Sequence, residues 1–64
     1  MSPTTMPCYV FEWHAQAREV FERLKERGER VVMEGAYGVT TDAPREVVDQ
    51  VAADAGTIVV EVLP

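Results

Sequence analysis

The sequence predicts a small α+β domain in which two helices alternate with four short strands, in the order β-α-β-β-α-β. Three observations support this prediction. Two stretches carry apolar residues at helical spacing, four runs are rich in β-branched or aromatic residues, and glycines separate several of these segments. With 64 residues the chain has room for one hydrophobic core, and an apolar fraction of 47% is enough to fill it.

The first segment is predicted at residues 8–13, because aromatic and β-branched residues together are typical of a strand. Alternation along this strand places Tyr9, Phe11 and Trp13 on one face. A long helix from Pro7 is the rival interpretation, since apolar residues from position 10 onward also recur at spacings of three and four. The strand is the favoured interpretation.

The clearest helix is predicted over residues 14–27. Its buried stripe follows the i, i+3, i+4, i+7 pattern and consists of Ala17, Val20, Phe21 and Leu24. On the opposite side Arg18 precedes Glu22 by four residues, and Glu19 precedes Arg23 by the same spacing, which favours ion pairs on the helix surface. Gly28 suits the left-handed conformation in which helices commonly end.

Residues 30–41 are predicted to form a β-hairpin. Residues 30–34 make one strand, the segment from Gly35 to Gly38 supplies two positions that tolerate positive φ, and residues 39–41 resume an extended pattern. A single long strand with a glycine bulge is the alternative.

A second helix is predicted to start at Asp42, whose carboxylate is a favoured cap, with Pro44 in the first turn. Its buried stripe consists of Val47, Val48, Val51, Ala52 and Ala55, and Gly56 ends it. The last strand is predicted over residues 57–63. Only Glu61 interrupts its apolar run after Thr57, so the strand is expected to lie centrally in the sheet or to cover an interface.

This order of elements is that of the ferredoxin-like fold, in which two helices cover one face of a four-stranded antiparallel sheet and leave the other open. Residues 1–7 are polar, contain two prolines and are predicted to form a flexible arm before a single compact domain over residues 8–64. Metal chaperones of this fold carry a CxxC motif where residues 14–17 here read His-Ala-Gln-Ala. Acylphosphatases need an active-site asparagine, and this chain contains none.

The chain offers little catalytic chemistry. Its single cysteine, Cys8, and its single histidine, His14, stand at opposite ends of the first predicted strand and are too few for a structural zinc site. Neither a calcium-binding loop nor a phosphate-binding glycine motif occurs. We therefore expect a protein that is not an enzyme and that uses no cofactor or metal.

Composition also restricts the partners. A net charge of −5 disfavours direct binding to nucleic acid or to an anionic membrane, because phosphate contacts require clustered lysine and arginine. No apolar run is long enough to cross a bilayer. A lone cysteine and the absence of a signal-peptide pattern at the N-terminus lead us to expect a cytoplasmic protein.

The acidic residues are unevenly distributed. Residues 31–64 contain six acids and only one basic residue, Arg45, whereas acids and bases balance in residues 1–30. We expect an acidic ridge on and near the second helix, and we name its residues as candidate partner-binding residues: Glu34, Asp42, Glu46, Asp49 and Asp54. An ordinary solvated helix face is the alternative interpretation of the same residues.

In size, acidity and lack of catalytic residues the chain resembles small phage-encoded inhibitors such as anti-CRISPR proteins, some of which mimic DNA. This resemblance implies a binding module that blocks a basic nucleic-acid channel on a partner protein, with Tyr9, Trp13 or Tyr37 as apolar anchors. Two alternatives remain open at this point. One is a structural or regulatory homo-oligomer, and the other is a ferredoxin-like dimer that binds a small molecule between its protomers.

Overall fold

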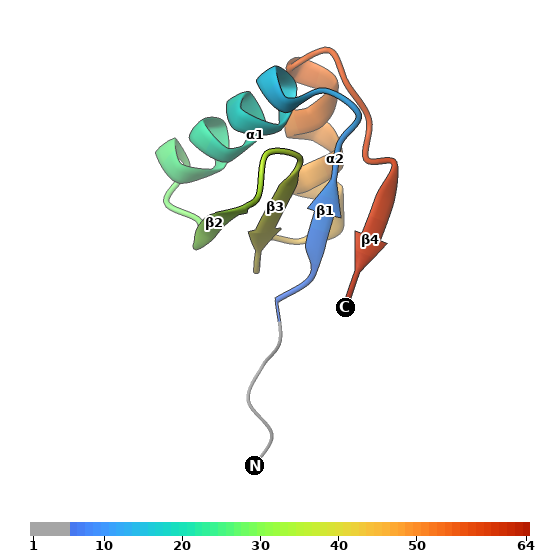
Figure 1. Cartoon of the computed structure of the whole chain (residues 1–64). Coiled ribbons are helices and arrows are strands. Elements are labelled where there is room, and N and C mark those ends of the chain that lie inside the picture. The colour runs from blue at the N-terminus through green and yellow to red at the C-terminus, as the bar shows by residue number, and fades with distance from the viewer. Residues whose placement is uncertain (1–5) are drawn as a thin grey trace.

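Six elements follow one another in the computed structural model, which describes residues 6–64 (Figure 1). The strands are β1 (Cys8–Val10), β2 (Val31–Glu34), β3 (Gly38–Thr41) and β4 (Glu61–Leu63), and the helices are α1 (His14–Glu26) and α2 (Arg45–Asp54). The predicted order β-α-β-β-α-β is confirmed. The predicted arm at residues 1–7 falls largely outside the described residues; at its end, the Pro7 carbonyl oxygen accepts a 3.3 Å hydrogen bond from the Thr41 N–H.

The four strands form one antiparallel sheet in the order β2-β3-β1-β4. Both helices lie on the same side of this sheet and contact each other, and α1 packs on β2 and β3 (Figure 1). The register opposes Tyr9 with Val39 on one side and with Val62 on the other, so these three side chains share the helix-covered face. The opposite face carries alternate residues of the same strands, among them Cys8, Val32 and Thr40.

Both helices end in the same way. After α1 the Gly28 N–H bonds to the Lys25 carbonyl and the Glu29 N–H bonds to the Leu24 carbonyl, which is the pair of hydrogen bonds of a Schellman motif. After α2 the corresponding bonds are made by the N–H groups of Gly56 and Thr57. Both glycines have positive φ, at 85° and 78°, as their predicted helix-ending role requires.

The core lies between the helices and the sheet. The predicted stripes supply its helical half: Ala17, Val20 and Leu24 of α1 are buried, as are Val48, Val51 and Ala52 of α2. The sheet supplies Tyr9 and Val39, and Phe11 follows β1 into the same core with 1% of its surface exposed. Burial of these aliphatic and aromatic groups is the main force that stabilises the fold.

The prediction for residues 8–13 is correct at its start and wrong at its end. The strand is confirmed for Cys8–Val10, so the rival long helix is excluded there. Trp13, however, is 60% exposed and does not join Tyr9 and Phe11 in the core. The reason is that Trp13 is the N-cap residue of α1, so the chain has already turned away from the sheet and the strand alternation has ended.

The hairpin of β2 and β3 is confirmed, and the single bulged strand is not formed. Gly35 opens the turn with φ at 69°, as predicted. Gly38 serves a different need, because its φ is not positive. A Cβ atom at this position would lie 2.7 Å from the Glu34 carbonyl oxygen and 2.8 Å from the Cys8 Sγ, so only glycine fits between these strands.

The prediction that Asp42 caps the second helix is wrong. The N-cap position of α2 is Pro44, and no side chain caps the helix. A residue that precedes proline avoids helical dihedrals, so the helix does not begin before Pro44. The approach to the helix is fixed instead by Thr41, whose hydroxyl oxygen accepts a 3.1 Å hydrogen bond from the Ala43 N–H.

Of the two expectations for the last strand, the central place in the sheet is wrong, and the role at an interface stays a prediction. β4 comprises only Glu61–Leu63 and lies at the edge of the sheet, where it pairs with β1 alone. Val62 and Leu63 remain 41% and 40% exposed. The chain leaves α2 through Gly56 and first bonds to β1 through the Val60 N–H, just before β4, while α1 covers β2 and β3 near the opposite edge. A long apolar run therefore indicated a strand but not its place in the sheet.

Candidate protein-binding surface

The acidic residues of α2 lie on the outside of the helix. Glu46, Asp49 and Asp54 are all exposed, whereas Val48 and Val51 on the inner side are buried. The amphipathic pattern causes this separation, because burial of the valine stripe turns the remaining positions of the helix toward solvent. Three of the five predicted partner-binding residues thus share one exposed helical surface.

Asp49 does not contribute a free negative charge to that surface. Its carboxylate lies 3.0 Å from the guanidinium Nε of Arg45, one helical turn earlier. Arg45 also lies over the Tyr9 ring, with 5.8 Å between the guanidinium carbon and the ring centroid. The i,i+4 spacing of these two charges was visible in the sequence, and it was the signal that Asp49 is paired.

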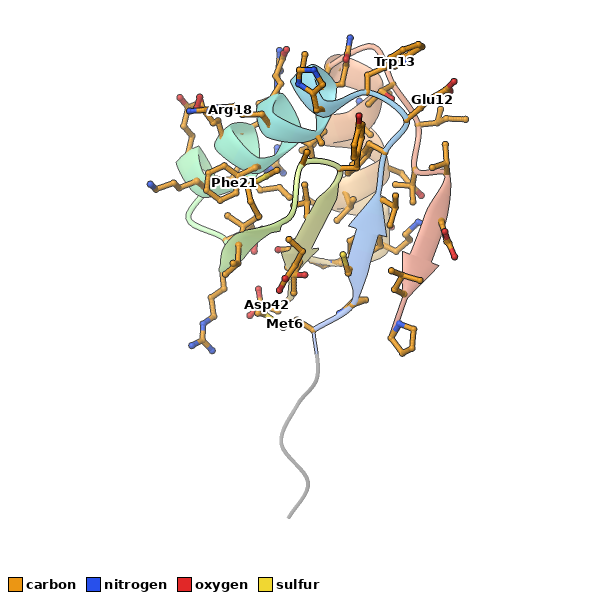
Figure 2. All side chains as sticks on the ribbon, viewed as in Figure 1. Met6, Glu12, Trp13, Arg18, Phe21 and Asp42 are labelled. Atoms are coloured by element: carbon orange, nitrogen blue, oxygen red, sulfur yellow. The ribbon has the colours of Figure 1, made fainter. Side chains whose placement is uncertain are left out.

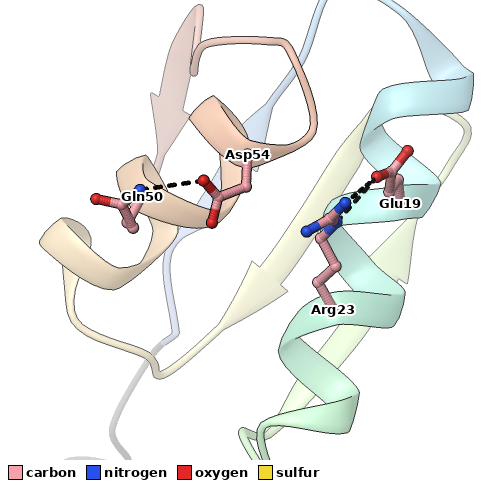
Figure 3. A network of polar contacts seen from close by, with 4 residues as sticks. All are labelled: Glu19, Arg23, Gln50 and Asp54. Carbon is pink, nitrogen blue, oxygen red and sulfur yellow. Dashed lines mark hydrogen bonds and ion pairs between the residues drawn. The ribbon is translucent and has the colours of Figure 1, made fainter.

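Asp54 keeps its charge. Its carboxylate accepts a 3.2 Å hydrogen bond from the Gln50 amide, a neutral donor that leaves the negative charge uncompensated. On the neighbouring helix the Glu19 carboxylate pairs with Arg23 at 2.7 Å (Figure 3). In Figure 3 the balanced Glu19–Arg23 pair thus belongs to α1 and the uncompensated Asp54 carboxylate to α2.

Asp42 and Glu46 flank the beginning of α2. Both are exposed, and within residues 6–64 neither side chain takes part in an ion pair or a hydrogen bond. Glu46 is the acid in the first turn of α2, where a negative charge is favourable next to the unpaired N–H groups of the helix. Figure 2 shows Asp42 at the end of the molecule opposite Glu12 and Trp13.

Glu34 lies apart from the other four acids. It ends β2 at the hairpin, and it shares the helix-free face of the sheet with Val32. The α2 helix is on the other side of the sheet (Figure 1). The structure thus brings Asp42, Glu46 and Asp54 to the side of the molecule that carries α2, and it leaves Glu34 on the other face.

The three aromatic residues that were expected to serve as anchors differ in exposure. Tyr9 is only 4% exposed and belongs to the core. Trp13 and Tyr37 are exposed, and the Tyr37 ring stands edge-on to the His14 ring with 6.2 Å between centroids. Trp13 lies with Ile58 along a shallow depression near the C-terminal end of α2, far from Asp42.

A groove that the sequence did not reveal runs between α1 and the hairpin. It encloses about 450 Å³ and is lined by His14, Arg18, Phe21, Met33, Gly35 and Ala36. In Figure 2 Arg18 and Phe21 project from α1 on the side of the molecule away from β4. Half-buried Phe21 and Met33 give the groove an apolar floor. The signal for its helical wall was present as the 14, 18, 21 spacing along α1.

Metal-ligating side chains do not converge in the part of the chain that the structure describes. No group of three or more histidine, cysteine, aspartate or glutamate residues is close enough to hold a metal ion there. Cys8 is half-buried in β1 as a free thiol. None of the helices in residues 6–64 is both long and apolar enough to span a membrane.

No protein-family model, curated protein or solved structure matches this chain. The function proposed below therefore rests on the charges and exposure of the surface residues themselves.

Proposed function

We propose that this protein is a non-enzymatic binding module that docks on a partner protein with a basic surface. In its concrete form it is an anti-CRISPR-like inhibitor that covers a nucleic-acid channel and mimics the negative charge of DNA or RNA. The acting surface is the α2 exterior together with Asp42 in the loop before it; Glu46 and Asp54 carry uncompensated charges on the helix, and Asp49 is paired with Arg45. The proposed fold is ferredoxin-like, and the proposed compartment is the reducing cytoplasm.

The observation that carries this proposal is the local excess of uncompensated carboxylates. Asp42, Glu46 and Asp54 have no cationic partner within residues 6–64, and Arg45 is already engaged by Asp49. The basic residues of α1, by contrast, include two that are paired within their own helix: Arg18 with Glu22 and Arg23 with Glu19. A surface of this kind steers association with a basic partner and gives that association a strong salt dependence.

The test compares two variants with the same change in net charge. Asp42→Lys with Glu46→Lys reverses the charge at the beginning of α2. Glu12→Lys with Glu26→Lys is the matched control, because both residues are exposed, lie outside α2 and form no ion pair within residues 6–64. Thermal melts followed by circular dichroism establish that both variants fold.

Each variant and the wild type are immobilised and used to capture proteins from a lysate at about 50 mM and about 500 mM salt. The expected partner binds the wild type and the control at low salt, binds the α2 variant at least about tenfold more weakly, and loses its own nucleic-acid binding when wild type is added. Equal loss with both variants would mean that net charge alone governs the capture. Undiminished binding to the α2 variant would exclude this surface as the interface.

A further inference from the structure

The outer edge of β2 presents backbone groups that no strand pairs within residues 6–64. The Phe11 N–H donates a hydrogen bond to the Tyr37 carbonyl, and the Thr41 N–H donates one to the Pro7 carbonyl. The backbone N–H and C=O groups of the odd-numbered residues of β3 therefore point toward β1. The backbone groups of the even-numbered residues of β3 point toward β2, where these residues pair with Val32 and Glu34. The N–H and C=O groups of the alternate β2 residues, Val31 and Met33, consequently point away from β3, toward the free edge of the sheet.

The side chains along this edge are complementary to a second copy of themselves. Val32 and Glu34 lie on the helix-free face, and alternation continued one residue before β2 assigns Arg30 to the same face; all three residues are exposed, Val32 by 51%. Neither Arg30 nor Glu34 forms an ion pair within residues 6–64. A positive charge thus stands at one end of the segment, a negative charge at the other, and an apolar residue midway between them.

We propose that β2 pairs with β2 of a second copy of this chain, antiparallel and with the twofold axis at Val32, so that the two sheets continue into one. This register places Arg30 of each copy opposite Glu34 of the other and brings the two Val32 side chains together. Opposite charges and apolar residues directly across a strand pair stabilise it, whereas like charges destabilise it.

The same register satisfies the free backbone groups. The Val32 pair is a non-hydrogen-bonded pair, in which Cα atoms approach to about 4.5 Å and side chains make their closest contact. On either side of it, Val31 of one copy and Met33 of the other form a hydrogen-bonded pair, which gives about four backbone hydrogen bonds across the axis. Each copy contributes the same segment, as a closed twofold dimer requires.

The groove beside β2 provides the second observation. It is bounded by α1 and by the hairpin that contains β2, and its floor includes Phe21 and Met33. Addition of a strand to β2 places the α1 helix of the second copy on the same side of the joined sheet, next to this groove. The two α1 helices then shield each other's half-buried Phe21 from water, which is favourable.

The other edge of the sheet fits a second copy less well. The even-numbered residues of β1 face β4, where Glu61 and Leu63 oppose Val10 and Cys8, so only Val62 of β4 directs its backbone outward. Pro64 follows directly and has no N–H to donate. A β4 pair would therefore form fewer backbone hydrogen bonds, and it would place no opposite charges across the axis.

The experiment uses charge swaps within β2 and sedimentation equilibrium from about 1 to 300 µM. Wild type is expected to dimerise. Arg30→Glu alone and Glu34→Arg alone each place like charges across the axis, so each is expected to weaken the dimer about tenfold or more. The double variant with both substitutions restores opposite charges and is expected to dimerise as wild type does. A mixture of the two single variants is expected to form a heterodimer.

Val62→Lys at the other edge is the control and is expected to leave the dimer unchanged. Circular dichroism establishes that every variant is folded. A monomeric wild type over the whole range overturns the proposal, as does a double variant that fails to recover dimerisation. Dissociation by Val62→Lys with no effect of the single swaps would assign the interface to β4 and also overturn it. None of these outcomes depends on the acidic surface of α2, so the proposed function is tested separately.

Discussion

The hydroxyl of Thr41 donates a 2.6 Å hydrogen bond to the carbonyl oxygen of Arg30. The Thr41 hydroxyl oxygen in turn accepts a hydrogen bond from the Ala43 N–H, so one buried side chain joins the residue before β2 to the loop that leads into α2. Thr41 is the one polar residue among residues 6–64 that is fully buried. The Arg30 carbonyl and the Ala43 N–H are both backbone groups, and within residues 6–64 neither forms another hydrogen bond outside the strand ladders.

Thr41→Val is expected to reduce the free energy of unfolding by about 1–3 kcal/mol, because it leaves the buried Ala43 N–H and the partly buried hydrogen-bonding site at the Arg30 carbonyl without their partner while keeping the shape of the side chain. Urea unfolding measures the change. Thr41→Ser keeps the hydroxyl and loses one methyl group, so it should cost less. A valine variant as stable as the serine variant would show that the two hydrogen bonds contribute little.

Gly38→Ala is expected to destabilise the fold more than Gly35→Ala, although both glycines belong to the same hairpin. At Gly38 the new Cβ meets a backbone oxygen at 2.7 Å, so the strands must separate, at a cost of about 1–3 kcal/mol or more. At Gly35 nothing lies within 4 Å, and the cost is the positive φ alone, about 1–2 kcal/mol.

Thermal melts of the two variants provide the comparison. Adding Cys8→Ala to Gly38→Ala removes one of the two close contacts, at the Sγ atom, and should recover part of the loss but not all of it, since the Glu34 carbonyl remains. Full recovery would mean that the backbone contact relaxes without cost.

Truncation of Phe11 is expected to destabilise the fold strongly, whereas truncation of Trp13 is expected to change its stability very little. Phe11→Ala opens a cavity in the core and should cost about 3–5 kcal/mol. Trp13→Ala removes a mostly exposed side chain and should change stability by less than about 0.5 kcal/mol. Trp13→Ser should be more stable than Trp13→Ala by about 1 kcal/mol, because α1 has no side-chain cap and serine supplies one. Chemical unfolding of the three variants tests all these expectations, and a large loss with Trp13→Ala would contradict the exposed position.

The first helix was predictable from the sequence almost to the residue, and the second was predictable at its end but not at its start, where Pro44 and not Asp42 is the N-cap. Their apolar stripes repeat at the helical period, and Gly28 and Gly56 end them through a local hydrogen-bond motif that depends on few residues. The existence of the four strands was also predictable from local sequence, because their β-branched and aromatic residues favour extended structure. The place of β4 in the sheet was not, because it depends on which strands the helices cover, a property of the whole fold.

The candidate surface was predictable in part. Exposure of Glu46 and Asp54 follows from the helical period of α2. The pairing of Asp49 with Arg45 was also within reach, since the two are four residues apart on one helix. The separation of Glu34 from the other acids was not, because it depends on which sheet face an edge-strand residue occupies, and one residue of register reverses that face.

The exposed apolar side chains at the end of the chain have a consequence for behaviour in concentrated solution. Ile58, Val60, Val62 and Leu63 form a β-prone segment in which Glu61 is the one charged gatekeeper. At neutral pH the net charge of −5 makes copies of the protein repel one another. Near the isoelectric point, about pH 4.6, that repulsion vanishes while the apolar edge persists. Mildly acidic conditions are therefore where disordered aggregation through β4 competes with specific assembly.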